Sequence, residues 1–113
     1  MNLSELQKKV MELANEKNWG TKPDDVIFAE KLALLHQEVS EALEAYRAGR
    51  LTGKDGVQEE LADIILRTLH LAGVYNIDLE KEILKKIKLN YDRDWSNDQL
   101  YKDRDLRNKN KPR

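Results

Sequence analysis

The sequence predicts an all-α fold, with a four-helix bundle-like protomer, on three observations. Lys, Glu, Leu and Ala dominate the 113 residues, and runs of β-branched residues are absent, which favours helices. Apolar side chains recur at steps of three and four residues in four segments, and Gly, Pro or Asn lies between those segments. The length suits one domain. Because 36% of the residues are charged, one copy has little apolar surface to bury, and we expect copies to associate.

The first helix is predicted over about residues 4–17. Ser4 and Gln7 have the spacing of a capping box, and leucines and valine follow at the helical period. Gly20 and Pro23 then break the helix. Trp19 lies in this break, outside the apolar stripe, so it is either a hydrophobic lid on the end of the bundle or a flat platform for a base or another ring.

The second helix is predicted from a cap at Asp24 or Asp25 to about residue 48, where Gly49 ends it. One face is polar and expected in water. The stripe expected to form the core consists of Leu32, Leu35, Val39, Leu43 and Tyr46. Glu38 and Glu41 belong to neither set, and they lie on a third side where a bundle helix ordinarily continues to pack.

The third helix, predicted over about residues 57–75, is apolar over a wide face and carries a narrow polar strip. Glu60 and Asp63 lie in that strip one helical turn apart, like the two acids of the second helix. The strip is either a solvent-exposed face with an Asp63–Arg67 ion pair or half of a ligand site. The matching acids on the second helix favour the ligand site.

Four carboxylates on two facing helices would repel one another and lose hydration unless a cation held them together. Hard divalent cations prefer oxygen ligands, and because the chain has no cysteine, any metal site must consist of oxygen or imidazole ligands. The predicted metal ligands are Glu38, Glu41, Glu60 and Asp63. Any of them could orient an attacking water, and Glu41 and Glu38 are the candidates for this catalytic role.

The fourth helix is predicted to begin after an N-cap at Asp78. Lys86, Asn90 and Arg93 follow one another at steps of four and three residues, so they share one face. A lysine, an amide and a guanidinium in one row suit an anion with several oxygens. The alternative is a lysine-rich face in solvent.

The net charge of −1 is unevenly distributed: acids outnumber bases over residues 1–84, and bases outnumber acids over residues 85–113. A polyphosphate that bridges an acidic metal site and a basic helix fits this asymmetry better than nucleic acid does. Residues 96–113 are predicted to form a charged tail, or an arm that reaches a neighbouring copy.

The sequence favours a cytoplasmic protein without a membrane partner. Glu5, Lys8, Lys9 and Glu12 exclude the apolar region that a signal peptide would need. No run approaches the ~18 apolar residues of a membrane span.

The order and spacing of these residues resemble the MazG-like, all-α nucleoside triphosphate pyrophosphohydrolases. The matching motifs are Glu38-x-x-Glu41, Glu60-x-x-Asp63 and Lys86-x-x-x-Asn90-x-x-Arg93. The segments LALLHQEVSEALEAYR and EELADIILRTLHLAG are similar to that family as well. The resemblance covers about residues 19–93.

The resemblance implies a helical domain over residues 1–95 that assembles as a dimer or a dimer of dimers, with Mg²⁺ held by the four acids. It implies hydrolysis of a (deoxy)nucleoside triphosphate to monophosphate and pyrophosphate, a reaction suited to house-cleaning of the nucleotide pool. Trp19 matches a tryptophan that stacks on the base, Lys86 and Asn90 match phosphate-binding residues, and Arg93 is assigned to the same role.

The residues themselves agree with this chemistry, because phosphoanhydride hydrolysis needs in-line positioning and charge neutralisation rather than a protein nucleophile. Three alternatives remain open. The first is a related pyrophosphohydrolase that acts on phosphoribosyl-ATP or dUTP. The second is a non-catalytic helical interaction module whose acids bind a basic partner. The third is a nucleic-acid binder that uses residues 85–113.

Overall fold

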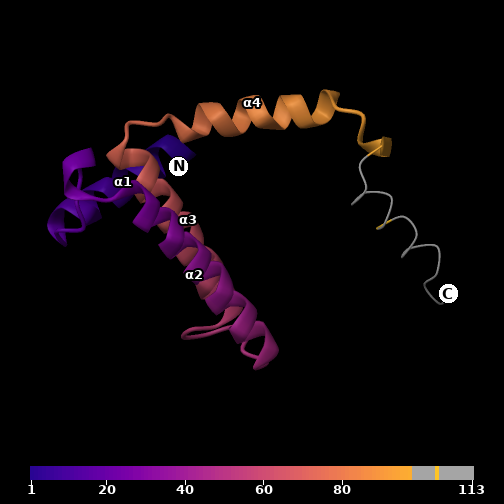
Figure 1. Ribbon diagram of the computed structural model, residues 1–113, viewed down its shortest axis with the longest axis horizontal. Coiled ribbons are helices and arrows are strands. Elements are labelled where there is room, and N and C mark those ends of the chain that lie inside the picture. Colours follow the sequence, from indigo (N-terminus) through magenta and orange to yellow (C-terminus); the bar gives the residue numbers. More distant parts are fainter. Residues whose placement is uncertain (98–103, 105–113) are drawn as a thin grey trace. The chain divides into compact units, whose positions relative to one another are not determined.

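The computed structural model describes residues 1–97 and residue 104, and within them the protein is all-helical, as predicted, with no strand (Figure 1). The α-helices are α1 (Leu3–Glu16), α2 (Phe28–Arg47), α3 (Val57–Val74) and α4 (Leu79–Asp92), and short 3₁₀ helices cover Pro23–Asp25 and Trp95–Asn97. The chain divides into two compact units, Met1–Lys81 and Glu82–Arg113. Most of the predicted tail, residues 96–113, lies outside the described residues.

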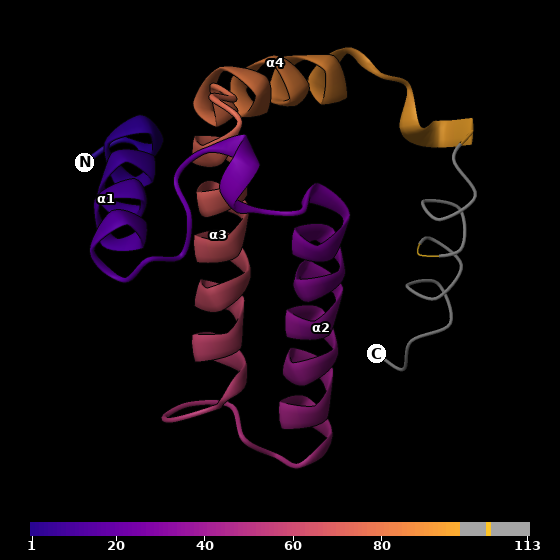
Figure 2. The same ribbon diagram turned by 60° about the vertical axis from the view of Figure 1, so that its left-hand side comes forward.

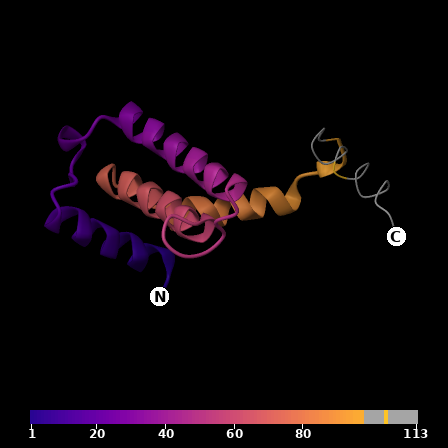
Figure 3. The same ribbon diagram turned by 90° about the horizontal axis from the view of Figure 1, so that it is seen from below.

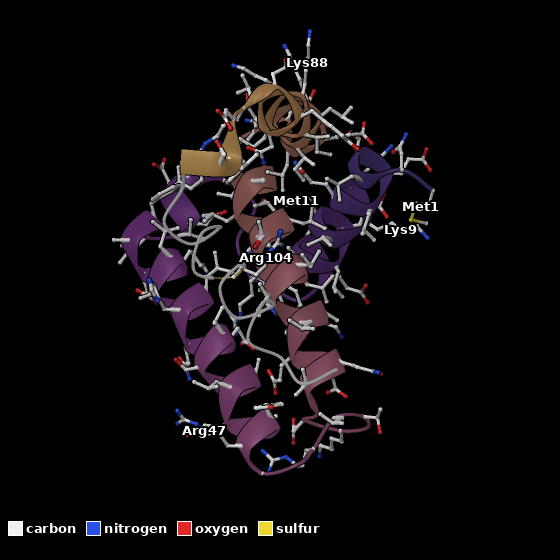
Figure 4. The ribbon with its side chains drawn as sticks, turned by 90° about the vertical axis from the view of Figure 1, so that its right-hand side faces the viewer. Met1, Lys9, Met11, Arg47, Lys88 and Arg104 are labelled. Atoms are coloured by element: carbon white, nitrogen blue, oxygen red, sulfur yellow. The ribbon has the colours of Figure 1, made fainter. Side chains whose placement is uncertain are left out.

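α3 is the central helix of the first unit. It forms a hairpin with α2 and also packs against α1, so that α1 and α2 flank it (Figures 2 and 3). The buried apolar side chains are Val10, Ala14, Ala45, Leu69, Leu71, Ala72 and Val74. Gly73 permits the close approach of α1, because a Cβ at this position would collide with the Met11 side chain, which lies between the two helices (Figure 4).

α1, α2 and α3 end in the same Schellman turn. Asn18, Gly49 and Asn76 adopt positive φ angles of 58°, 76° and 55°, a conformation that glycine and asparagine tolerate best. In each turn the backbone N–H of the following residue donates a hydrogen bond to a carbonyl oxygen of the helix. The pairs are Trp19 N to Ala14 O at 2.9 Å, Arg50 N to Ala45 O at 2.9 Å and Ile77 N to Ala72 O at 2.8 Å. The predicted end at Gly49 is confirmed, and Trp19 is fixed directly beyond α1.

The predicted cap of α1 is wrong, whereas the predicted cap of α4 is confirmed. Asn2 caps α1, because its Oδ1 accepts the N–H of Glu5 at 2.8 Å. The Ser4 hydroxyl instead donates to Glu80 Oε2 at 3.0 Å, a contact 76 residues away in sequence that local spacing cannot reveal. Asp78 Oδ1 accepts the N–H three residues later at 3.0 Å, as an N-cap does.

The start of α2 also differs from its prediction. Asp25 Oδ2 accepts the N–H groups of Thr21 and Lys22, each at 3.1 Å, and these bonds hold the pKa of Asp25 below its usual value. The aspartate therefore closes the turn before the 3₁₀ helix instead of capping α2, which begins at Phe28.

The face of α2 that packs is not the predicted apolar stripe. Ala45 and Glu38 are the buried residues of this helix. Four members of the predicted stripe are exposed: Leu32, Val39, Leu43 and Tyr46. The neighbouring face of α2, which carries Glu38 and Ala45, is the one that is buried.

No helix within residues 1–97 combines the length and the apolar character that a bilayer span requires.

Candidate functional site

The first unit contains a cavity of about 600 Å³. Its lining comes from the loop after α1, from α2 and from α3: Asn18, Trp19, Lys31, Glu38, Asp63, Leu66, Arg67 and His70. On α3 the polar members Asp63, Arg67 and His70 lie at steps of four and three residues, and therefore on one face. At 1.5 Å per residue this row extends over roughly 10 Å, from an acidic end to an aromatic end.

Three carboxylates meet at the acidic end. Glu38, Glu60 and Asp63 can each place one oxygen within 4.8 Å of the other two. Glu38 and Glu60 are only 7% exposed, and within the described chain the Oε2 atom of each is buried without a hydrogen-bond partner. Ionised carboxylates accept but do not donate, so they cannot satisfy one another. Buried acceptors without donors are costly, and a hard cation would satisfy both.

The electrostatics of the cluster agree with this geometry. Burial, the close approach of the Glu38 carboxyl group, and the charges of Glu41, Glu38 and Asp63 raise the pKa of Glu60 to about 7. Burial and the neighbouring acids also raise the pKa of Asp63, against the opposing charge of Arg67. Near neutral pH, a proton and a metal ion therefore compete for this cluster.

Glu41 lies near the cluster without belonging to it. It is not one of the three acids that can converge, although its charge contributes to the raised pKa of Glu60. Its Oε1 instead accepts a hydrogen bond from Gln37 Nε2 at 3.2 Å. The structure thus brings together three of the four predicted ligands.

Arg67 joins the two helices at this end of the cavity. Its Nε donates to Glu38 Oε1 at 2.8 Å. The alternative Asp63–Arg67 pair along α3 is therefore wrong, since the guanidinium reaches across to α2. The sequence indicates only an i, i+4 pair between Asp63 and Arg67, and this local spacing gives no indication of the contact between Arg67 and Glu38.

Trp19 and His70 form the aromatic end. Their ring centroids are 6.1 Å apart with planes at 66°, an edge-to-face arrangement, and Trp19 remains 45% exposed. His70 is buried, and its Nε2 bonds the carbonyl oxygen of Gly20 at 2.8 Å. Since a carbonyl only accepts, this nitrogen carries the proton and ties the loop that bears Trp19 to α3.

Sequence reasoning missed His70, Lys31 and Asn18 as cavity residues. The spacing of His70 from Arg67 and Asp63 puts all three in one row on α3, and this row could have identified His70. Lys31 lies seven residues, or about two turns, before Glu38, so the same face of α2 carries both. That spacing could have identified Lys31.

Of the predicted phosphate-binding row, Lys86 and Asn90 lie on α4, and Arg93 directly follows its last residue; all three belong to the second unit. None of Lys86, Asn90 and Arg93 is among the side chains that line the cavity. Trp95 contacts the end of this row: its Nε1 donates to Asn90 O at 2.8 Å, and Arg93 Cζ lies 4.2 Å from the ring centroid, a cation–π distance.

No family model, curated protein or solved structure matches the chain. The MazG-like resemblance therefore remains a prediction.

Proposed function

We propose that the protein is a metal-dependent nucleoside triphosphate pyrophosphohydrolase, which cleaves (deoxy)nucleoside triphosphates to monophosphate and pyrophosphate. The observation that carries this proposal is the cavity with two chemically different ends. At one end three carboxylates converge and two of them have buried, unpartnered oxygens. At the other end Trp19 presents an exposed ring. A nucleotide has two corresponding ends, because its phosphates bind metal ions and its flat base can stack on an aromatic ring.

Glu38, Glu60 and Asp63 would hold Mg²⁺ or Mn²⁺, with Glu41 as the fourth ligand or as a neighbour. The ion would neutralise phosphate charge and make a water more acidic. Glu41 is the first candidate to orient the attacking water, because its carboxylate is near the cluster but not one of the three. Glu38 is the second candidate, and it would take this role only if its Oε2, which has no hydrogen-bond partner among the described residues, did not bind the ion.

The base would lie on Trp19, and the phosphates would extend toward the acids. Stacking on an aromatic ring is tolerant of the base and worth about 1–3 kcal/mol. Lys86, Asn90 and Arg93 are proposed to bind phosphate oxygens, since an ammonium, an amide and a guanidinium together suit an anion with several oxygens. We place the reaction in the cytoplasm, where it would act on the nucleotide pool.

We propose a homodimer or a dimer of dimers as the functional form. The exposed apolar side chains of α2 support this association: Leu32, Val39, Leu43 and Tyr46. They recur at helical spacing along one face, and rows of this kind on monomers mark interaction sites.

A screen of nucleotides with Mg²⁺, with Mn²⁺ and with chelator tests the activity. It should include the common deoxynucleoside and ribonucleoside triphosphates, damaged forms, dUTP and phosphoribosyl-ATP, with products identified. We expect pyrophosphate as the product and loss of activity with chelator. Orthophosphate as the first product would reject the α–β cut. A protein that neither hydrolyses any of them nor gains thermal stability from metal would be the non-catalytic interaction module.

A further inference from the structure

We infer that Arg67 binds the sugar-bearing phosphate of the ligand, and that Glu38 holds this guanidinium with one oxygen while offering the other to the metal. This inference rests on the proposed function and adds a phosphate-binding residue from the first unit to it.

Glu38 has two oxygens in different situations. Oε1 accepts the Nε–H of Arg67 at 2.8 Å. Oε2 is buried and has no hydrogen-bond partner within the described chain. Glu38 is also one of the three acids that can hold an ion. One carboxylate thereby connects a fixed cation to the metal position, and each of its oxygens has one task.

Most N–H donors of the Arg67 side chain have no hydrogen-bond acceptor among the described residues. A guanidinium has five N–H bonds, and within the described residues only the one on Nε has a hydrogen-bond acceptor. The side chain is 42% exposed and lines the cavity, so Nη1 and Nη2 remain available to a ligand there. Two parallel donors on a planar group match two oxygens of one phosphate.

The position of Arg67 along α3 selects the phosphate. It lies four residues from Asp63 and three from His70, or roughly 6 Å and 4.5 Å along the helix axis. If the base of a nucleotide lies against Trp19 and its phosphates lie at the acids, then the part of the nucleotide between base and phosphates lies beside Arg67. The phosphate joined to the sugar is the one that reaches this point.

The charge of Arg67 also argues against a role in metal binding alone. A guanidinium beside the carboxylates repels a divalent cation and therefore weakens metal binding. The same charge assists a polyphosphate, whose negative charge exceeds what one divalent ion neutralises. Phosphate affinity and metal affinity should thus respond to Arg67 in opposite directions.

Calorimetry separates these two responses. We would titrate Mn²⁺ alone, and then α,β-methylene deoxynucleoside triphosphates of all four bases in the presence of Mn²⁺, into wild type, Arg67→Gln, Arg67→Lys and Arg47→Gln. Arg47 is a matched control because its loss changes the net charge equally, and it projects from the end of α2 away from α3 (Figure 4). Circular dichroism verifies the fold of each variant.

We expect Arg67→Gln to bind Mn²⁺ as tightly as wild type or more tightly, and to bind the analogue about tenfold more weakly or worse. Arg67→Lys should recover only part of this loss, because an ammonium lacks the planar fork. Arg47→Gln should match wild type. Unchanged analogue affinity in Arg67→Gln would overturn the inference. An equal loss of Mn²⁺ and analogue affinity would also overturn it, because Arg67 would then only orient Glu38.

The inference and the proposed function fail in different ways. If wild type binds an analogue and Arg67→Gln binds it equally well, only the role of Arg67 is wrong. If wild type binds no analogue with Mn²⁺, the proposed function is wrong and the inference falls with it.

Discussion

On α2 a face with acidic side chains is buried, whereas the adjacent face with apolar side chains is exposed to solvent. Glu38 is 7% exposed, whereas Val39, the next residue, is 54% exposed. Burying a carboxylate and exposing an apolar row both reduce the stability of a single copy. Neither face is therefore explained by the stability of the protomer. Under the proposed function, a ligand would account for the acidic face, and a second copy of the chain would account for the apolar face.

The largest expected effect concerns the acidic face. Asp63→Asn keeps the shape of the side chain and removes one charge from the cluster. We expect metal-dependent hydrolysis to fall by about a hundredfold or more, because positioned ions and charges supply most of this catalysis. After chelation, the variant should be more stable than wild type by about 1 kcal/mol, since a repulsive charge has been removed. Activity assays and thermal melts with and without Mg²⁺ measure both effects.

Glu44→Gln is the matched control on the exposed polar face of α2, and it should keep its activity and its metal response. An Asp63→Asn variant that stays active, loses a little stability and responds to Mg²⁺ like wild type would end the metal-site interpretation.

The second prediction concerns an exposed apolar side chain inside the cavity. Trp19→Ala should raise KM about tenfold with little change in kcat, because a lost stacking surface weakens binding of the base. Steady-state kinetics on the best substrate of the screen measures this change. A lower melting temperature with unchanged KM would place Trp19 with the packing residues and not with the ligand.

The third prediction uses the pKa of Glu60, which is about 7 in the folded protein against 4.5 for the free group. The folded state binds this proton more tightly, so the stabilisation is fully present below pH 4.5 and is lost as the pH rises through 7. With chelator present, wild type should therefore lose stability relative to Glu60→Gln across this window. Urea unfolding of both proteins between pH 4.5 and pH 8 measures the difference. A constant difference would mean that Glu60 titrates normally.

The smallest effect on protomer stability is expected from the apolar face. Leu43→Gln should change the free energy of unfolding by less than about 0.5 kcal/mol per protomer, because the side chain is already exposed. It should also shift the assembly toward single copies, which light scattering detects. Ala45→Leu, on the packed face, should instead cost about 1–3 kcal/mol through overpacking. The comparison of the two faces would be wrong if Leu43→Gln were the more destabilising change.

The sequence by itself determined the helices, because helix formation depends on short-range spacing, turn residues and caps. The end of α2 at Gly49 and the cap of α4 at Asp78 follow from rules that span four residues. The convergence of Glu38, Glu60 and Asp63 was also predictable. Glu38 lies off the polar face of α2, and Glu60 and Asp63 occupy the narrow polar strip of α3, so the matching spacing on two helices of a hairpin indicated that these acids face one another.

Only the tertiary structure decided which side of each helix is buried. Periodicity shows that α2 has an apolar row, but the partner that covers this row need not belong to the same chain. It also cannot show that Ser4 bonds Glu80, that His70 bonds Gly20, or that Arg67 chooses Glu38 over Asp63. Each of these contacts joins residues at least 29 positions apart, where competition among acceptors in three dimensions, and not local spacing, selects the partner.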